Sequence, residues 1–230
     1  MDAIILAGGL GTRLQSVVSD VPKCMAIVNG VPFLEYVLHY GYQQGITKFI
    51  LSVGYKSEII EEYISKQHYP FTIVCSKEIE PLGTGGAILN SLVHTTQTNV
   101  LVLNGDTYFA YTLNETALLQ FKNNVSCTLF LKEMEQIDRY GIVTTDGKKI
   151  TAFYEKQFVA KGLINTGVYI LNTQHFATLK LNNKFSFEKD YLEKYVQQLH
   201  FEAIPQNGYF IDIGIPTDYA KAQIDLKNKL

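Results

Sequence analysis

Apolar runs and helical stretches alternate along the first half of the chain. Short apolar runs typical of buried strands lie at 3–7, 48–53, 71–76 and 99–104. Helical periodicity separates these runs, at 32–44, 58–66 and 84–94. Strands joined by helices of this length predict right-handed βαβ crossovers and a mainly parallel sheet. This half of the chain therefore predicts an α/β fold.

Two of the predicted helices carry recognisable end signals. Pro32 stands at the start of the first helix and Gly45 follows its end, which is the usual placement of these residues. Ser57 precedes the second helix, where its hydroxyl can accept a hydrogen bond from the first turn. We expect Ser57 to be the N-cap of that helix, with Ile60 and Ile64 on its buried face.

The pattern changes after residue 125. Strands are predicted in SCTLFLKEM, GIVTT, KITAFYE and INTGVYIL, which span 126–134, 141–145, 149–155 and 164–171. Asp146-Gly147 predicts a tight hairpin turn. Helices return at 186–198 and 217–229. Because no linker, repeat or low-complexity tract interrupts the chain, we expect one domain, 1–230, with halves of about 1–124 and 125–230 that share one sheet.

Composition narrows the class of protein. The net charge is −2 and 47% of residues are apolar, so nothing in the balance indicates nucleic acid or an anionic membrane as partner. Three cysteines, odd in number and without metal-ligand spacing, indicate reduced thiols. Neither a signal peptide nor an apolar run of the roughly 20 residues that span a bilayer is visible. These observations predict a cytoplasmic protein.

A glycine cluster follows the first strand. Gly8, Gly9 and Gly11 allow backbone N–H groups to approach a ligand closely, and a phosphate chain is the usual ligand of such a loop. Two familiar phosphate-binding motifs do not match this loop. G-x-x-x-x-G-K started at Gly8 needs Lys at position 14, and G-x-G-x-x-G started at Gly9 needs Gly there, but the chain has Leu14. The loop carries Arg13 instead, and we expect a phosphate cradle of another type with its own cation.

Carboxylates in two other segments are candidate metal ligands. The segment LNGDT ends the fourth strand in Asp106, at the same edge of the predicted sheet as the glycine loop. Asp212 lies within an apolar strand, where an unpaired carboxylate would be costly. A Mg²⁺ ion shared by the two would explain both residues. A buried, hydrogen-bonded Asp212 is the alternative.

Further polar residues stand in short motifs. Lys23 follows Pro22 in a stretch without regular periodicity, and PLGTGGAIL (81–89) forms a second glycine turn at a helix start. FYEK and INTGVY supply Glu155, Lys156 and Asn165, which suit sugar hydroxyls and a sugar phosphate. No Ser/His/Asp or Cys/His set has the spacing of a catalytic group, so nothing indicates a protein nucleophile.

Together these motifs resemble the sugar-1-phosphate nucleotidylyltransferases. In order they are AGGLGTRL, PKCM, PLGTGG, NGDT, YGIV, FYEK, INTGVY and DIGIPTDY, and they cover the chain from Ala3 to about Gln223. The stretches GLGTRLQSVVSDVPKCMA and LSVGYKSEIIEEY look most like the D-glycero-D-manno-heptose 1-phosphate guanylyltransferases. Mannose-1-phosphate guanylyltransferases and the hexose or muramate 1-phosphate uridylyltransferases are the alternatives. The C-terminal β-helix of many relatives is not expected in this chain.

The resemblance implies a reaction and a fold. An NTP and a sugar 1-phosphate would give an NDP-sugar and pyrophosphate by in-line attack on the α-phosphorus, with Mg²⁺ as cofactor. The fold would be a Rossmann-like, mostly parallel mixed sheet flanked by helices, with a β-rich sugar-binding extension. GTP and a heptose 1-phosphate would be the partners, without nucleic acid or membrane, and the product would supply a surface polysaccharide. The oligomeric state stays open, a homodimer included.

The same resemblance implies site residues. Arg13 would hold the leaving pyrophosphate, and Lys23 the α-phosphate. Those implied for the nucleotide are Leu6, Ala7, Gly8, Gly9, Gly11, Thr12, Arg13, Lys23, Glu78, Glu80, Gly83, Thr84 and Gly105. Those implied for the sugar phosphate are Gly141, Glu155, Lys156 and Asn165, and those for the metal are Asp106 and Asp212. The catalytic set would be Arg13, Lys23 and Asp106.

The base of the nucleotide substrate is predicted from one residue position. Uridylyl members of the family carry Gln five residues before the glycine of the L-G-T-G motif, and this chain has Glu78 there. A carboxylate can accept hydrogen bonds from the two adjacent donors of guanine, N1–H and N2–H₂. In uracil, N3–H lies between two carbonyl oxygens, which would repel the carboxylate. Guanine is favoured, with Glu80 as a second candidate. The family usually has Pro or Ala where this chain has Cys24, whose reactivity the sequence leaves open.

Two other classes of protein share part of the pattern. A metal-dependent glycosyltransferase would have a similar sheet, but its usual D-x-D motif is missing at residues 104–106. A nucleotide-sugar sensor or an inactive partner subunit typically loses the catalytic cations or the metal carboxylates, and this chain keeps them. An enzyme is therefore the favoured interpretation.

Overall fold

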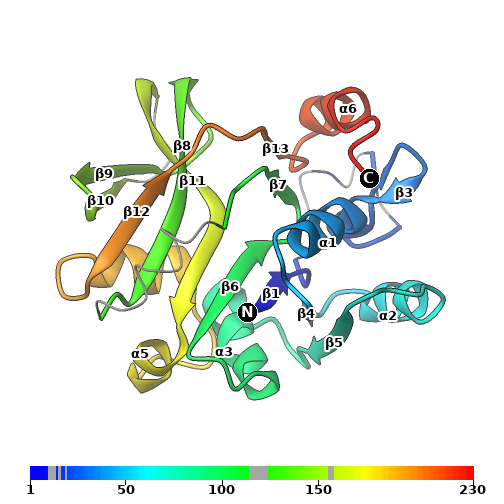
Figure 1. Ribbon diagram of the computed structural model, residues 1–230, viewed down its shortest axis with the longest axis horizontal. Coiled ribbons are helices and arrows are strands. Elements are labelled where there is room, and N and C mark those ends of the chain that lie inside the picture. The colour runs from blue at the N-terminus through cyan, green and yellow to red at the C-terminus, as the bar shows by residue number, and fades with distance from the viewer. Residues whose placement is uncertain (10–13, 15–16, 19, 114–123, 155–157) are drawn as a thin grey trace.

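A single large sheet organises the molecule (Figure 1). A computed structural model describes residues 1–9, 14, 17–18, 20–113, 124–154 and 158–230. Within them, nine strands form one sheet in the order β5-β4-β1-β6-β11-β8-β12-β10-β9. Two-stranded pairs β13-β7 and β2-β3 lie beside it. The α/β fold class with a mixed sheet flanked by helices is confirmed.

The first half contains the parallel part of the sheet. Its strands are β1 (Asp2–Leu6), β2 (Ile27–Val28), β3 (Val31–Pro32), β4 (Lys48–Val53), β5 (Thr72–Lys77), β6 (Asn99–Asn104) and β7 (Thr107–Phe109). Its helices are α1 (Phe33–Gln43), α2 (Ser57–Ser65) and α3 (Gly83–Ser91), with 3-10 turns at Lys23–Met25 and Leu92–His94. Because β5, β4, β1 and β6 all pair in parallel, their carboxyl ends lie at one edge.

The end signals of the first two helices have different outcomes. Helix α1 begins directly after Pro32, and Gly45 follows its end with φ +87°, as predicted. Ser57 is not the N-cap of α2, because the helix already includes it. The N-cap is Lys56, in the left-handed region with φ 51°, and a tight turn with Ser57 N–H donating to the Gly54 carbonyl (3.2 Å) starts the helix early.

The second half adds mostly antiparallel strands, of which β8 and β11 are long. They are β8 (Cys127–Ile137), β9 (Ile142–Asp146), β10 (Lys149–Tyr154), β11 (Val159–Asn172), β12 (Phe201–Pro205) and β13 (Phe210–Asp212). The helical elements are α5 (Thr173–Thr178), a π-helix at Phe187–Glu193 and α6 (Pro216–Asp225). Strand β11 joins the halves, since it pairs antiparallel with both β6 and β8. Gly147 supplies the predicted turn between β9 and β10 with φ +56°.

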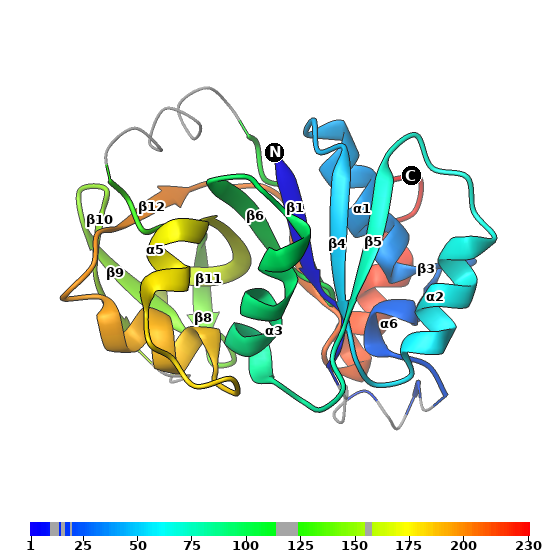
Figure 2. The same ribbon diagram turned by 90° about the horizontal axis from the view of Figure 1, so that it is seen from below.

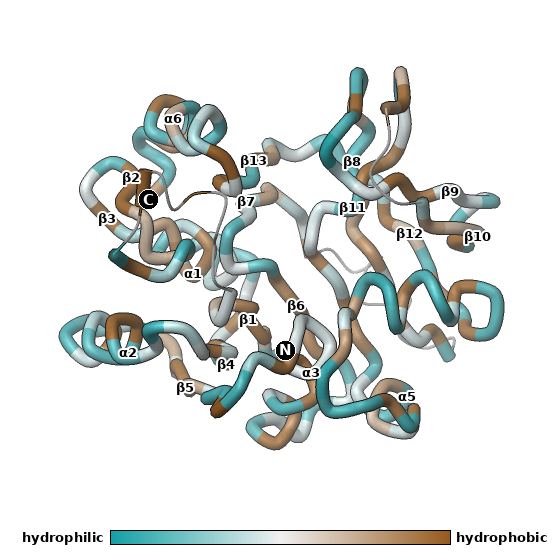
Figure 3. The backbone as a smooth tube through the Cα atoms, turned by 180° about the vertical axis from the view of Figure 1, so that it is seen from behind, coloured by the Kyte–Doolittle hydropathy of each residue, from teal (hydrophilic) through white to brown (hydrophobic). Residues whose placement is uncertain are grey.

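Alternation along the strands divides the core into two layers. Ala3 and Ile5 of β1 face one hydrophobic cluster, which is packed by α1, α2 and α6, whereas Ile4 faces a second cluster, packed by α3, α5 and the π-helix. Figure 2 shows these two groups of helices on opposite faces of the sheet. Hydrophobic positions run along the central strands between them (Figure 3). The central strands β1, β4 and β6 thus bury both of their faces, which accounts for their continuous apolar runs in the sequence.

A short two-stranded pair extends the carboxyl edge of the sheet. Strand β7 follows β6 after a turn at Gly105 and Asp106, and it pairs antiparallel with β13, which brings Asp212 opposite Thr107. The Ile213 N–H donates to the Asp106 carbonyl at 3.0 Å and extends this pairing. None of the helices in the described ranges is long and apolar enough to cross a membrane.

Candidate active site

A cavity of about 640 Å³ lies at the carboxyl edge of the parallel strands. Loops that follow four neighbouring strands line it, and so do Lys23, Glu188 and Gly214. All the described residues that the family resemblance implies for the nucleotide lie on its wall, namely Leu6, Ala7, Gly8, Gly9, Lys23, Glu78, Glu80, Gly83, Thr84 and Gly105. Asp106 lines it too. Gly11, Thr12, Arg13, Glu155 and Lys156 fall outside the described residues, so their roles stay predictions.

The glycines at the strand ends have a packing role. A Cβ atom on Gly8 would lie 2.8 Å from Glu78 Oε1, and one on Gly105 would lie 2.6 Å from the Leu6 carbonyl oxygen. Gly9 has open space around the position of a Cβ atom. The loops after β1, β5 and β6 therefore need glycine to pack against one another, and Gly9 is the one that leaves room for a ligand.

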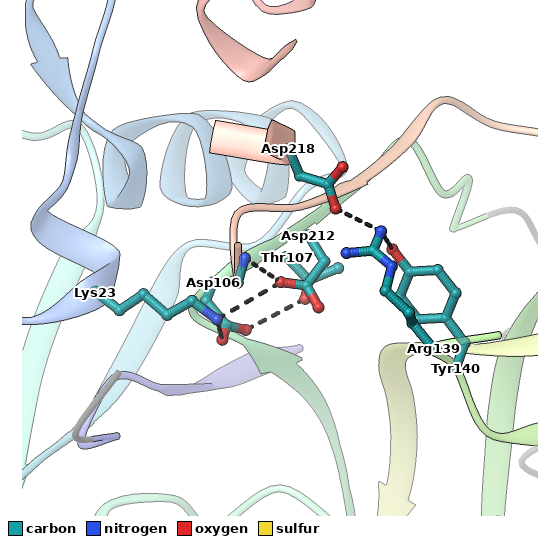
Figure 4. Close-up of polar contacts among 8 residues, drawn as sticks. Lys23, Asp106, Thr107, Arg139, Tyr140, Asp212 and Asp218 are labelled. Atoms are coloured by element: carbon teal, nitrogen blue, oxygen red, sulfur yellow. Dashed lines mark hydrogen bonds and ion pairs between the residues drawn. The ribbon is translucent and has the colours of Figure 1, made fainter. Parts of the chain in front are cut away.

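An ion-pair cluster lies at one side of the cavity (Figure 4). The ammonium of Lys23 forms a short hydrogen bond to Asp106 Oδ2 and lies 3.6 Å from Asp212 Oδ1. The backbone N–H of Gly214 donates to Asp212 Oδ1 at 2.6 Å, and the Thr107 hydroxyl donates to Asp106 Oδ1 at 3.3 Å. Two carboxylates from distant parts of the sequence thus converge on one cation of the protein.

The two carboxylates fit a magnesium ion. Mg²⁺ prefers oxygen ligands and is usually held by one or two carboxylates together with substrate phosphates and water. The described residues contain no group of three or more His, Cys, Asp or Glu side chains that could hold a metal. The described residues therefore do not form a metal site made of protein ligands alone. Two carboxylates, Asp106 and Asp212, fit a Mg²⁺ ion whose other ligands are phosphate oxygens and water.

Glu78 lies in the loop after β5. Its Oε1 accepts a hydrogen bond from the Ser52 hydroxyl (3.0 Å), and its Oε2 accepts one from the Leu82 N–H (3.0 Å). Each oxygen of an ionised carboxylate has a further lone pair, so these bonds orient the group and leave it able to accept from a ligand. Glu80 is exposed, with no comparable anchor among the hydrogen bonds of the described residues.

The second glycine turn packs against the π-helix segment. Gly83 has φ +71°, and a Cβ atom there would lie 2.5 Å from the Phe185 carbonyl oxygen. The Thr84 hydroxyl donates to Glu188 Oε2 (2.8 Å) and accepts from the Phe187 N–H (2.8 Å). Sequence reasoning missed Glu188, which lines the cavity; its motif, FSFEKDYL, has no spacing that marks a ligand-binding residue.

The two described sugar-side residues, Gly141 and Asn165, lie apart from this cavity. The Asn165 N–H donates to the Gly141 carbonyl at 3.2 Å, which joins the two positions. The Asn165 amide donates to the Tyr169 hydroxyl (2.8 Å), and its Oδ1 accepts from the Gly167 N–H (3.1 Å). Neither Gly141 nor Asn165 lines the 640 Å³ cavity. The structure brings these two residues together but not into the space next to Lys23.

Arg139 is a second cation near the carboxylates that the sequence did not single out. Arg139 lies in the bend before Gly141, and its guanidinium donates a hydrogen bond to Asp218 Oδ2 at 2.6 Å. Figure 4 shows this guanidinium on the side of Asp212 that faces away from Lys23. Burial alone would lower the pKa of Arg139. The hydrogen bond to Asp218 and the nearby charges of Tyr140, Asp218 and Asp212 raise it instead.

Cys24 lies on the cavity wall as an almost fully buried thiol. Its side chain is 2% exposed, and its Sγ contacts the Ala7 carbonyl oxygen at 3.9 Å. Burial, and then the charge of Asp106, raise the pKa of the Cys24 thiol to about 12. Because the thiolate is the nucleophilic form, we expect Cys24 to react slowly near neutral pH.

Comparisons with known proteins extend over almost the whole chain. The family model for nucleotidyl transferases matches residues 2–229. The chain is 47% identical to D-glycero-alpha-D-manno-heptose 1-phosphate guanylyltransferase of Aneurinibacillus thermoaerophilus, over 99% of both chains. It is 45% identical to the Campylobacter jejuni protein of the same name, over 95% of this chain and 97% of that one.

A solved structure agrees with these relatives. The crystal structure of HddC from Yersinia pseudotuberculosis superposes with a TM-score of 0.86 and 38% identity, over 98% of this chain and 99% of that one. The same protein has been crystallised with GMP-PN, and that structure gives a TM-score of 0.84. The fold, the cavity at the carboxyl edge and the match along residues 2–229 agree, and the chain belongs to the nucleotidyl transferase family.

Proposed function

We propose that the protein transfers a guanylyl group from GTP to D-glycero-D-manno-heptose 1-phosphate, giving GDP-heptose and pyrophosphate. The observation that carries this proposal is the identity of 45–47% to two heptose 1-phosphate guanylyltransferases over nearly the full length of each. Mannose-1-phosphate guanylyltransferases match at 27–30% identity, and this chain spans only 62–66% of their length. The heptose is therefore the favoured sugar.

The cluster around Lys23 supports the chemistry of the transfer. In an in-line displacement at the α-phosphorus, a sugar phosphate oxygen attacks and pyrophosphate leaves, so the protein must position two anions and stabilise developing charge. On this proposal Lys23 binds the α-phosphate, where that charge develops. Gly8 and Gly9 lie beside the triphosphate, and Arg13 of the same loop holds the leaving pyrophosphate.

Asp106 and Asp212 would hold a Mg²⁺ ion in this site. When bound, the ion supplies Lewis-acid stabilisation of the phosphate oxygens and orients them. The side chains themselves are held by the protein, Asp212 by the Gly214 N–H at 2.6 Å and Asp106 by the Thr107 hydroxyl at 3.3 Å. Their orientation is therefore set before any ligand arrives.

Guanine would be recognised by the loop after β5. Glu78 is oriented by Ser52 and Leu82 and lies on the cavity wall. Its remaining acceptor capacity matches the paired donors of guanine. Uracil and cytosine do not offer two adjacent donors in this arrangement, so the same carboxylate would discriminate against UTP and CTP.

The second half of the protein would bind the sugar phosphate. The contact between Gly141 and Asn165 supports a common wall for the sugar, and the resemblance assigns Glu155 to the sugar and Lys156 to its phosphate. Because GTP is a cytoplasmic substrate, we expect the enzyme to work in the cytoplasm, where its product would supply a surface polysaccharide.

A screen of substrate pairs tests the proposal. Pyrophosphate release would be measured for each of the four NTPs against heptose, mannose, glucose and N-acetylmuramic acid 1-phosphates. GTP with heptose 1-phosphate should give the highest kcat/KM. A higher value for GTP with mannose 1-phosphate, or for UTP with a hexose phosphate, would replace the proposed substrate. Tight binding of GDP-heptose without pyrophosphate release from any pair would indicate a sensor.

A further inference from the structure

Lys23 lies where a divalent cation would have to bind. Its ammonium contacts Asp106 Oδ2 and is 3.6 Å from Asp212 Oδ1, so one cation of the protein neutralises both proposed metal ligands (Figure 4). The Lys23 side chain is only 12% exposed. The Asp106 and Asp212 side chains are 34% and 30% exposed, so the ammonium end of the cluster is enclosed and its carboxylate end reaches solvent.

The surrounding backbone is shaped to hold the ammonium there. A Cβ atom on Gly214 would lie 2.9 Å from Lys23 Nζ and 2.7 Å from Asp212 Oδ1, so any side chain at this position would press on the ion pair. Lys23 itself begins a 3-10 turn after Pro22, whose backbone is stiff. The position of the ammonium between the carboxylates is thus part of the fold.

An ammonium and a divalent ion compete for the same carboxylate oxygens. A metal ion bound to Asp106 Oδ2 and Asp212 Oδ1 would take the oxygens that Lys23 uses and would repel its positive charge. Displacement of Lys23 costs less free energy when another anion accepts the ammonium. The phosphates of an NTP are such an anion, and the proposed role of Lys23 at the α-phosphate supplies the new partner.

We propose that Lys23 and the divalent cation compete for Asp106 and Asp212, so that the metal enters together with the nucleotide. In the free protein Lys23 holds the two carboxylates and keeps the affinity for metal low. The triphosphate draws the ammonium away, and the freed oxygens then bind the metal. This inference rests on the proposed metal site, and it assigns Lys23 a role before the chemical step as well as during it.

The proposal predicts opposite effects of one substitution. Lys23→Met keeps an unbranched side chain and removes the charge, so Mn²⁺ should bind the nucleotide-free variant at least about tenfold more tightly than the wild type. Pyrophosphate release should fall at the same time, because the cation at the α-phosphate is lost. A general loss of structure would weaken both properties, whereas competition raises one and lowers the other.

The experiment measures Mn²⁺ binding by electron paramagnetic resonance, with the full chain and without nucleotide. Lys48→Met is the matched control, because Lys48 is also part-buried and lies 3.7 Å from Asp2, away from the cavity. It should bind Mn²⁺ like the wild type. Addition of GMP-PN should raise Mn²⁺ affinity strongly in the wild type and less in Lys23→Met, since the competitor is already gone. Lys23→Gln repeats the test with a polar side chain.

Two results would contradict the inference in different ways. If Asp212→Asn abolishes Mn²⁺ binding but both Lys23 variants, shown by urea unfolding to be folded, bind it no more tightly than the wild type, competition is wrong and the metal site stands. If Asp106→Asn and Asp212→Asn leave Mn²⁺ binding unchanged, the proposed metal site is wrong and the competition falls with it. Tighter binding in Lys48→Met as well would show a nonspecific effect of charge and would also overturn the proposal.

Discussion

The two halves of the sheet present their candidate site residues in different ways. In the first half β5, β4, β1 and β6 are parallel, and the loops after them line one cavity. In the second half β8 and β11 are long and antiparallel, and Asn165 lies within β11 next to a register shift. Site residues of the first half therefore follow from strand direction, whereas those of the second half depend on which residues pair.

The difference extends to how the halves meet. Strand β11 pairs with β6, and Gly167 of β11 packs closely on Asn104 at the end of β6. Strand β13, from the end of the chain, carries Asp212 back to Asp106. The nucleotide site thus depends on the second half for one of its two proposed metal ligands, although most of its wall comes from the first half.

The largest loss of activity is expected at Asp106 and Asp212, which come from different halves of the chain and would share one metal ion. Asp106→Asn and Asp212→Asn should each lower kcat by about two orders of magnitude or more while the fold survives. The double variant should lose little more, because residues that act as a unit are not additive. Steady-state pyrophosphate release checks this, with Asp146→Asn at the exposed end of β9 as control. Multiplicative losses in the double variant would mean that the two residues act separately.

The contact between the halves can be broken with one methyl group. Gly167 has φ +75°, and a Cβ atom there would collide with the Asn104 side chain. Gly167→Ala should lower the free energy of unfolding by about 2–4 kcal/mol, from left-handed strain and overpacking together. Gly147→Ala is the control, since Gly147 has φ +56° and open space, and should cost only the strain, about 1–2 kcal/mol. Equal losses in urea unfolding would show that β11 shifts without cost.

The next largest effect is expected from the proposal that the first half binds GTP and the second half binds the sugar 1-phosphate. Lys156→Ala should raise the KM for the sugar 1-phosphate about tenfold or more, since a lost charge-assisted phosphate contact costs about 1.5–3 kcal/mol. The KM for GTP should change much less. Steady-state kinetics with each substrate varied in turn measures both values. An equal change in the two would contradict the sugar site on the FYEK strand.

The complementary variant acts on the first half alone. Glu78→Gln should weaken the use of GTP and improve the relative use of UTP, by about 1–3 kcal/mol in the ratio of kcat/KM. Because Glu78 also accepts from the Leu82 N–H, Ser52→Ala is a useful control that removes one anchoring bond without changing the carboxylate. An unchanged ratio of GTP to UTP in competition would exclude Glu78 as the base-reading residue, and Glu80 would be tested next.

The smallest effect concerns two of the three cysteines, Cys24 on the cavity wall and Cys75 on the edge strand β5. The raised pKa of Cys24, about 12, leaves about one thiol in ten thousand ionised at pH 8. Iodoacetamide should therefore modify the half-exposed Cys75 first, and Cys24 only after unfolding or as the pH approaches 12. Peptide mass spectrometry after timed labelling checks this. Equally fast labelling of native Cys24 would contradict its enclosed position.

Local sequence patterns predicted most of the strands in the first half of the chain. The runs 3–7, 48–53, 71–76 and 99–104 are each a strand, within one residue at either end. In three of them, β1, β4 and β6, both faces are buried, and this gives a continuous apolar run. From parallel strands alone it follows that Gly8 and Asp106 lie at one edge, and the structure brings both to the cavity wall. The motifs also indicated the family before any fold was known.

Only the tertiary structure decided which distant residues meet. Lys23 contacts Asp106 and Asp212 because β13 pairs with β7, and Glu188 reaches Thr84 because the π-helix segment packs on α3. The apolar strand around Asp212 was predicted and is β13, but the short β12 and the contact of Arg139 with Asp218 carried no signal in the periodicity. Periodicity depends on which face of a local element is buried, whereas long-range pairing depends on the packing of the whole core. The sequence therefore indicated what each segment is, and only the folded core decided what it touches.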